Sequence, residues 1–121
     1  MKVLVKRVGE SPKELDIDSN NTLSAMQKIV GGYIEPVSIN NHIDVICNEE
    51  GKICGLNPNA YLYTDEDGVL DCLCGDIVFA RYNDDGDYES LTYDDIKALK
   101  DMLNTHIVYT CGCLPAIELE E

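Results

Sequence analysis

The sequence predicts an α+β fold, with a mixed, mostly antiparallel sheet, an N-terminal β-hairpin and two packed helices at about residues 22–31 and 93–104. Short stretches in which apolar and polar residues alternate recur along the chain, as is typical of strands. Two other segments repeat their apolar residues at helical spacing. Clusters of Gly, Asn, Asp and Pro separate these segments, which indicates frequent turns.

The N-terminal hairpin is predicted from two alternating segments around a turn. Val3 and Val5 share a period of two, and Leu15 and Ile17 alternate with acidic residues. Between them, residues 9–12 read Gly-Glu-Ser-Pro, which is turn chemistry. We therefore expect two strands that pair around this turn.

The middle of the chain predicts a helix followed by strands. Asn20, Asn21 and Thr22 supply capping side chains, and Gly31-Gly32 ends the helix. Four strands are then expected, and the segment Gly55–Asn59 is expected to be irregular because proline interrupts a ladder of hydrogen bonds. The expected strands are residues 33–39, 42–47, 69–74 and 76–82, with Gly75 as a bulge between the last two.

The second helix carries the clearest local signal. Thr92 and Asp95 resemble a capping box, and Ile96, Leu99 and Leu103 form an apolar stripe. A last strand is expected at residues 107–110, and residues 115–121 are expected to form a frayed acidic tail. With no repeat or linker, residues 1–121 are expected to form a single domain.

The charge balance limits the classes of partner. The 121 residues include 23 acidic and nine basic ones, which gives a formal net charge of −14. Such a surface repels phosphate backbones, so direct nucleic-acid binding is not expected. The acidity serves solubility in one interpretation, and in the other the carboxylates imitate DNA phosphates to block a DNA-binding protein.

The sequence predicts a cytoplasmic protein with reduced cysteines. No segment has the roughly 18 apolar residues of a membrane span. The first residues, Met1–Arg7, lack the long apolar stretch and cleavage site of a secretory signal. The six cysteines are therefore expected to be free thiols.

Two kinds of chemistry find weak support. The C-x-C pairs Cys72/Cys74 and Cys111/Cys113 could supply four zinc ligands, but structural zinc sites usually use wider spacing, and core packing explains the residues equally well. Nucleophilic catalysis would need His42 or His106, and no nucleophile elbow or phosphate-binding loop is present. No cofactor is expected, and a small hydrolase stays an alternative.

The stretch from Gly31 to Ala60 offers the most informative loops. Asparagines on glycine-bounded loops present donors and acceptors without charge, which suits the recognition of a base or ribose edge. Turn formation alone explains the same residues. The candidate ligand-binding residues are Tyr33, Glu35, Asn48, Glu49, Glu50, Lys52, Asn57 and Asn59.

These loops also carry a family resemblance. The blocks at residues 31–35, 48–52, 55–59 and 75–78, with a late Leu91–Ile96 block, resemble the DUF3846 family of phage and bacterial domains of unknown function, over about residues 23–103. Leu56-Asn57-Pro58-Asn59 departs from the Leu-Pro-x-Asn order common in that family. The resemblance implies a protein of phages, mobile elements or gut bacteria, often beside antirestriction genes, and hence a host-interaction or anti-defence role.

The resulting hypothesis is a non-enzymatic binding protein that captures a nucleotide-derived small molecule or a host protein. In it Asn48, Asn57 and Asn59 read polar edges, Tyr33 stacks and Lys52 meets phosphate. An anionic ligand requires a locally neutral or positive pocket, because the chain as a whole is acidic. The alternative is a DNA-mimic-like module with a stripe of carboxylates from residues 65–71, 84–89 and 94–95. A homodimer is compatible with either hypothesis.

Overall fold

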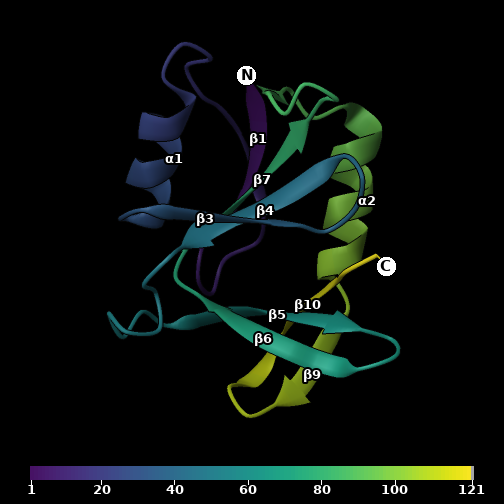
Figure 1. Cartoon of the computed structure of the whole chain (residues 1–121). Helices are drawn as coiled ribbons and strands as arrows, with labels where there is room; N and C mark the ends of the chain where they lie inside the picture. Colours follow the sequence, from purple (N-terminus) through teal and green to yellow (C-terminus); the bar gives the residue numbers. More distant parts are fainter. Residues whose placement is uncertain (121) are drawn as a thin grey trace.

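A computed structural model describes residues 1–120 and contains two helices and ten strands (Figure 1). In chain order the elements are β1 (Lys2–Lys6), β2 (Lys13–Asp16), α1 (Thr22–Val30), β3 (Ile34–Ser38), β4 (Ile43–Asn48), β5 (Pro58–Thr64), β6 (Gly68–Cys74), β7 (Ile77–Tyr82), β8 (Tyr88–Glu89), α2 (Tyr93–Leu103), β9 (His106–Tyr109) and β10 (Gly112–Glu118).

The first sheet is antiparallel throughout. Its strand order is β2-β1-β7-β4-β3, and the short β8 adds to β7. Alternate residues of β1, β4 and β7 point to opposite faces, as the period of a strand requires. One face packs against α1 through Met26 and Val30, together with Val3, Ile46 and Val78 of the sheet.

The second sheet lies below the first in Figure 1, with strand order β6-β5-β10-β9. Its neighbours pair antiparallel except for β10, which runs parallel to β5 with Ala116 opposite Tyr61. The inner faces of the two sheets and the apolar stripe of α2 share one core. That core contains Leu4 and Phe79 of the first sheet, Leu62 and Ile117 of the second, and Leu99 of α2.

The predicted α+β class is confirmed, including the N-terminal hairpin and both helices. Gly31 ends α1 with φ of 80°, a left-handed conformation that glycine adopts without steric cost, and its N–H donates to the carbonyl of Gln27. At the start of α2, the hydroxyl of Thr92 accepts from the backbone N–H of Asp95, and the Asp95 carboxylate accepts from the backbone N–H of Thr92. The predicted capping box is therefore present.

Two expectations were wrong, one about the C-terminal segment and one about the loop around Pro58. Residues 115–121 were expected to fray, but residues 115–118 belong to β10, and Ala116 and Ile117 are fully buried. Pro58 was expected in an irregular segment, yet it begins β5. β10 forms because Ala116 and Ile117 pair with β5, which is distant in the sequence, and Pro58 joins β5 because it pairs with Cys74 of β6. No local sequence pattern reveals either pairing.

No helix among residues 1–120 is long and apolar enough to cross a membrane.

The capping box predicts a specific loss of stability. Thr92→Ala leaves the first turn of α2 without its side-chain acceptor, and we expect the free energy of unfolding to fall by about 1 kcal/mol. Asn21→Ala is the matched control, because Asn21 occupies the same position at α1 but its side chain makes no capping hydrogen bond. Urea denaturation of both variants checks this, and an equal loss in the two would contradict the assignment.

Candidate functional site

Five of the predicted ligand-binding residues line one cleft. Glu35 comes from β3, Asn48 ends β4, and Glu49, Glu50 and Lys52 follow in the next loop. Together with part of β6 they enclose about 280 Å³. We call this the acidic cleft; its other lining residues are Val37, Cys47, Gly51, Ile53, Asp71, Cys72, Leu73 and Cys74.

The charge of the acidic cleft opposes an anionic ligand. Four carboxylates line it, from Glu35, Glu49, Glu50 and Asp71, against the single ammonium of Lys52. Lys52 is already paired with Asp71, and this hydrogen-bonded ion pair raises the pKa of Lys52. The lysine that was expected to meet phosphate is therefore engaged by a carboxylate of the same cleft.

Asn48 holds the backbone together at the rim of the cleft. Its side-chain Nδ2 donates to the carbonyl of Val30 at 3.1 Å, and its Oδ1 accepts from the backbone N–H of Glu50 at 2.8 Å. These bonds connect the C-terminal end of α1 to the loop after β4. A side chain at Gly51 would come within 2.6 Å of the Cys74 carbonyl, so the loop packs closely on β6 here.

The other three predicted residues lie outside the cleft lining. Tyr33 is 71% exposed, and Asn57 is exposed with its carbonyl accepting from the N–H of Gly75. Asn59 is 1% exposed and accepts from the Nζ of Lys6 at 2.8 Å, while its Nδ2 donates to the carbonyls of Lys6 and Gly75. The three asparagines therefore do not meet in one recess, because Asn59 is committed to a buried structural contact.

The carboxylates proposed as a DNA-like stripe do not form one continuous run. Glu89 and Asp95 both pair with Arg81, which places the 84–89 and 94–95 segments together at the N-terminal end of α2. The turn between β5 and β6, with residues 65–67, lies beside the second sheet, toward the other end of α2 (Figure 1). Asp71, from the same predicted stripe, lines the acidic cleft instead. The residues proposed for the stripe are thus divided among separate parts of the surface.

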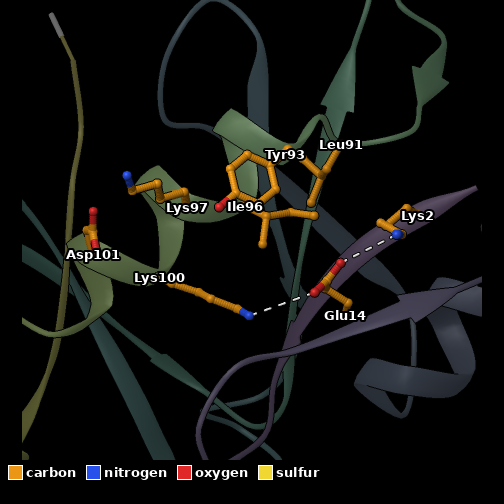
Figure 2. Close-up of a pocket in the computed structure, with 8 residues that line it drawn as sticks. All are labelled: Lys2, Glu14, Leu91, Tyr93, Ile96, Lys97, Lys100 and Asp101. Atoms are coloured by element: carbon orange, nitrogen blue, oxygen red, sulfur yellow. Dashed lines mark ion pairs between the residues drawn. The ribbon is translucent and has the colours of Figure 1, made fainter.

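A second hollow lies beside α2, away from the loops that were predicted to bind a ligand (Figure 2). It encloses about 330 Å³ between the outer side of this helix and the first two strands. We call it the α2 hollow; it is lined by Lys2, Glu14, Leu91, Tyr93, Ile96, Lys97, Lys100 and Asp101.

The α2 hollow gathers three of the nine basic residues of the chain. Figure 2 shows Lys2 and Lys100 reaching Glu14 from two sides, with Nζ–carboxylate distances of 3.4 and 3.8 Å. Lys97 makes no ion pair within residues 1–120. The hollow is thus locally positive, with three ammonium groups against Glu14 and Asp101.

An aromatic ring and an apolar floor complete the α2 hollow. The side chain of Tyr93 is 80% exposed, whereas Leu91 and Ile96 beneath it are buried. Tyr93, Lys97 and Lys100 recur at the spacing of one helical face, a signal that was available in the sequence once the helix was predicted. The sequence did not predict that Lys2 and Glu14 line the same hollow, because their position depends on how the N-terminal hairpin packs beside α2.

The two histidines give no support to a hydrolase. His42 is exposed between β3 and β4, and the Nδ1 of His106 lies 3.0 Å from the carbonyl oxygen of Asn104. Within residues 1–120, neither imidazole hydrogen-bonds to a cysteine or a carboxylate.

Comparison with known proteins gives a family and no function. The sequence profile described as "Domain of unknown function (DUF3846)" matches residues 1–104 of the 121-residue chain. The chain belongs to the DUF3846 family. No curated protein and no solved structure matches it.

The DUF3846 match includes the acidic cleft and the α2 hollow and ends with α2. The hairpin of β9 and β10 follows the matched residues. Cys111 and Cys113 lie in this hairpin, and Cys72 and Cys74 lie on β6. In the part of this DUF3846 chain that the structure describes, no three His, Cys, Asp or Glu side chains group as metal ligands would, so the proposed four-cysteine zinc set is not assembled.

The thiols of this DUF3846 chain differ in their environments. Burial raises the pKa of Cys47 to about 11 and that of Cys72 to about 12, with the neighbouring Cys111 and Cys74 thiols adding to the latter. Cys54, Cys111 and Cys113 are exposed. As the Cα–Cβ bonds alternate along β6, Leu73 is buried between the two half-buried cysteines, as the strand pattern predicts.

These environments predict the order of alkylation. Because the thiolate is the reactive form, a short pulse of iodoacetamide at pH 8 should label Cys54, Cys111 and Cys113 well before Cys47 and Cys72. Peptide mass spectrometry measures each site, with the urea-unfolded chain as the control in which all six react. Labelling of Cys47 as fast as Cys54 in the folded chain would contradict this assignment.

Proposed function

We propose that this chain is a non-enzymatic binding protein that captures a small nucleotide-like anion in the α2 hollow. The observation that carries the proposal is the clustering of Lys2, Lys97 and Lys100 around one exposed aromatic ring, on a chain whose net charge is −14. An anion must find a locally positive surface on such a protein. Of the two hollows described above, the α2 hollow meets this requirement and the acidic cleft does not.

The base and the phosphate of a nucleotide each have a counterpart in the α2 hollow. The exposed ring of Tyr93 offers a face for a base, and Leu91 and Ile96 supply an apolar floor. Lys97, which makes no ion pair within residues 1–120, is available to bind a phosphate. Lys2 and Lys100 can bind a phosphate in place of the Glu14 carboxylate. The ion pairs with Glu14 hold these two lysines in position until the anion arrives.

The mobile-element setting that the family resemblance implies would give such capture a purpose. Bacterial defence that depends on a nucleotide signal fails when the signal is removed. A protein that binds the signal without cleaving it would therefore protect the element. This role is part of the proposal and rests on the same hollow.

The proposal predicts ligand binding that depends on Lys97. We expect at least one member of a panel of mono-, di-, tri- and cyclic nucleotides to raise the melting temperature, because a ligand that binds the folded chain stabilises it. Lys97→Ala should weaken binding about tenfold, or ~1.4 kcal/mol. Binding should also weaken as salt is added, because exposed charges are screened. Isothermal titration measures the affinities.

Lys28→Ala is the matched control for this experiment. Lys28 is also an exposed lysine on a helix without an ion pair within residues 1–120, but it belongs to α1 and lies outside the hollow. A panel without any binder, or an equal loss of affinity in the two variants, would refute the proposal.

The acidic cleft favours a second candidate function, the docking of a basic side chain from a partner protein. Its four carboxylates surround a space that already accommodates the ammonium of Lys52. An arginine or lysine from a partner would exchange with Lys52 for Asp71 and meet Glu49 and Glu50 at the rim. This version of the acidic interaction module needs a compact cleft rather than a continuous stripe.

The second candidate predicts that the position of the carboxylates matters, not only their number. The double variant Glu49→Gln/Glu50→Gln should weaken binding of a fluorescent tetra-arginine peptide at least fivefold more than Asp84→Asn/Asp85→Asn, which removes the same charge from the turn after β7. Fluorescence anisotropy measures both. An equal loss of affinity in the two variants would mean that the peptide binds by general attraction between opposite charges. It would exclude the acidic cleft as the binding site.

A further inference from the structure

The outer edge of β9 pairs with no other strand of residues 1–120. β9 is the last strand of the second sheet, next to β10 alone (Figure 1). The N–H of Ala116 donates to the carbonyl of Thr105 at 2.9 Å, and the register continues with Leu114 opposite Ile107. Because hydrogen-bonded and non-hydrogen-bonded pairs alternate in an antiparallel ladder, the backbone groups of His106 and Val108 point away from β10.

The other sheet edges carry features that discourage pairing with another chain. β2 consists largely of charged residues, and β3 has Pro36 at its centre. β6 has a register shift against β5, and its Asp71 is engaged by Lys52. β9, with the sequence His-Ile-Val-Tyr, has no proline, lysine or carboxylate. Among the edge strands of four or more residues within residues 1–120, β9 is the one that has none of these protections.

The charge distribution indicates which partner fits this edge. Between Asp101 and Glu118 the sequence contains no Asp, Glu, Lys or Arg, although the whole chain carries −14. Two copies of so acidic a protein repel each other over most of their surfaces. At the β9 hairpin they can approach without facing like charges, and Val108 and Tyr109, 76% and 56% exposed, offer apolar surface there.

We propose that the chain forms a symmetric homodimer in which β9 pairs antiparallel with β9 of a second copy. An antiparallel strand edge is complementary to itself, so one surface supplies both halves of a two-fold interface. With Val108 opposite Val108 of the second copy, the outward N–H of each Val108 donates to the carbonyl of the other. The two four-stranded sheets then join into one. The interface does not include the α2 hollow, so the test of the dimer is independent of the test of nucleotide binding.

The proposal is tested by the mass of the full chain in solution. Sedimentation equilibrium should show the mass rising toward twice that of one chain with concentration. Added salt should strengthen the dimer, because it screens the repulsion between two chains of charge −14. A single-chain mass up to about 1 mM, where even weak specific pairing is detected, would overturn the proposal.

Two substitutions at Val108 locate the interface. Val108→Lys places two ammonium groups opposite each other and should weaken the dimer at least tenfold, whereas Ile53→Lys, the same change at a side chain that is 86% exposed elsewhere, should leave it unchanged. Val108→Pro should give monomers as well, because it removes an outward N–H that the ladder to β10 does not use. Melting temperatures are measured beside the masses to show that each variant is folded.

The outcomes separate the proposal from its alternatives. Folded variants at Val108 that are monomeric, with a dimeric Ile53→Lys, support it. A dimer that survives both Val108 substitutions overturns it, as does one that Ile53→Lys dissociates, because the acidic cleft would then be the interface. If Val108→Pro fails to fold, Val108→Lys gives the same decision alone.

Discussion

A buried lysine and a buried asparagine join the two sheets, and the rest of the structure depends on this contact. Lys6 ends β1 of the first sheet and is 6% exposed, while Asn59 lies near the start of β5 in the second sheet and is 1% exposed. The ammonium donates to Asn59 Oδ1 and to the carbonyl of Arg7, both at 2.8 Å. Asn59 returns two hydrogen bonds to backbone carbonyls, one of them at Gly75 where β6 leads into β7. Burial lowers the pKa of Lys6, and Asp76 and Glu10 partly offset this.

Three surfaces of differing charge lie at separate places around the two sheets. The acidic cleft is lined by β3 and the end of β4 on one side and by β6 on the other, so its width is the spacing between the sheets. The α2 hollow lies where the helix that covers the shared core meets the N-terminal hairpin. The uncharged hairpin of β9 and β10 forms one edge of the second sheet. The acidic chain thus presents one negative, one positive and one uncharged surface.

The helices and the N-terminal hairpin could be predicted from residues close together in the sequence. Contacts between residues distant in the sequence could not be predicted. Thr92 and Asp95 cap α2 as expected because a capping box requires residues only three positions apart. β10 was not predicted, since its short apolar run at Ala116 and Ile117 becomes a strand only beside β5. Asparagine is a common turn residue, and nothing near Asn59 in the sequence indicates that its side chain hydrogen-bonds to Lys6. Glu49, Glu50 and Lys52 line one cleft with Asn48 because consecutive loop residues stay together in any fold.

A double-mutant cycle between Lys6 and Asn59, with stabilities measured by urea denaturation, tests most directly whether this contact joins the two sheets. Lys6→Met leaves the amide oxygen of Asn59 without its donor, and Asn59→Leu leaves a buried ammonium with one partner fewer, so each single variant should be strongly destabilised. The double variant removes both polar groups. We expect it to lose roughly 1–3 kcal/mol less than the sum of the single losses. Single losses that add to within about 0.5 kcal/mol would contradict the role given to this pair.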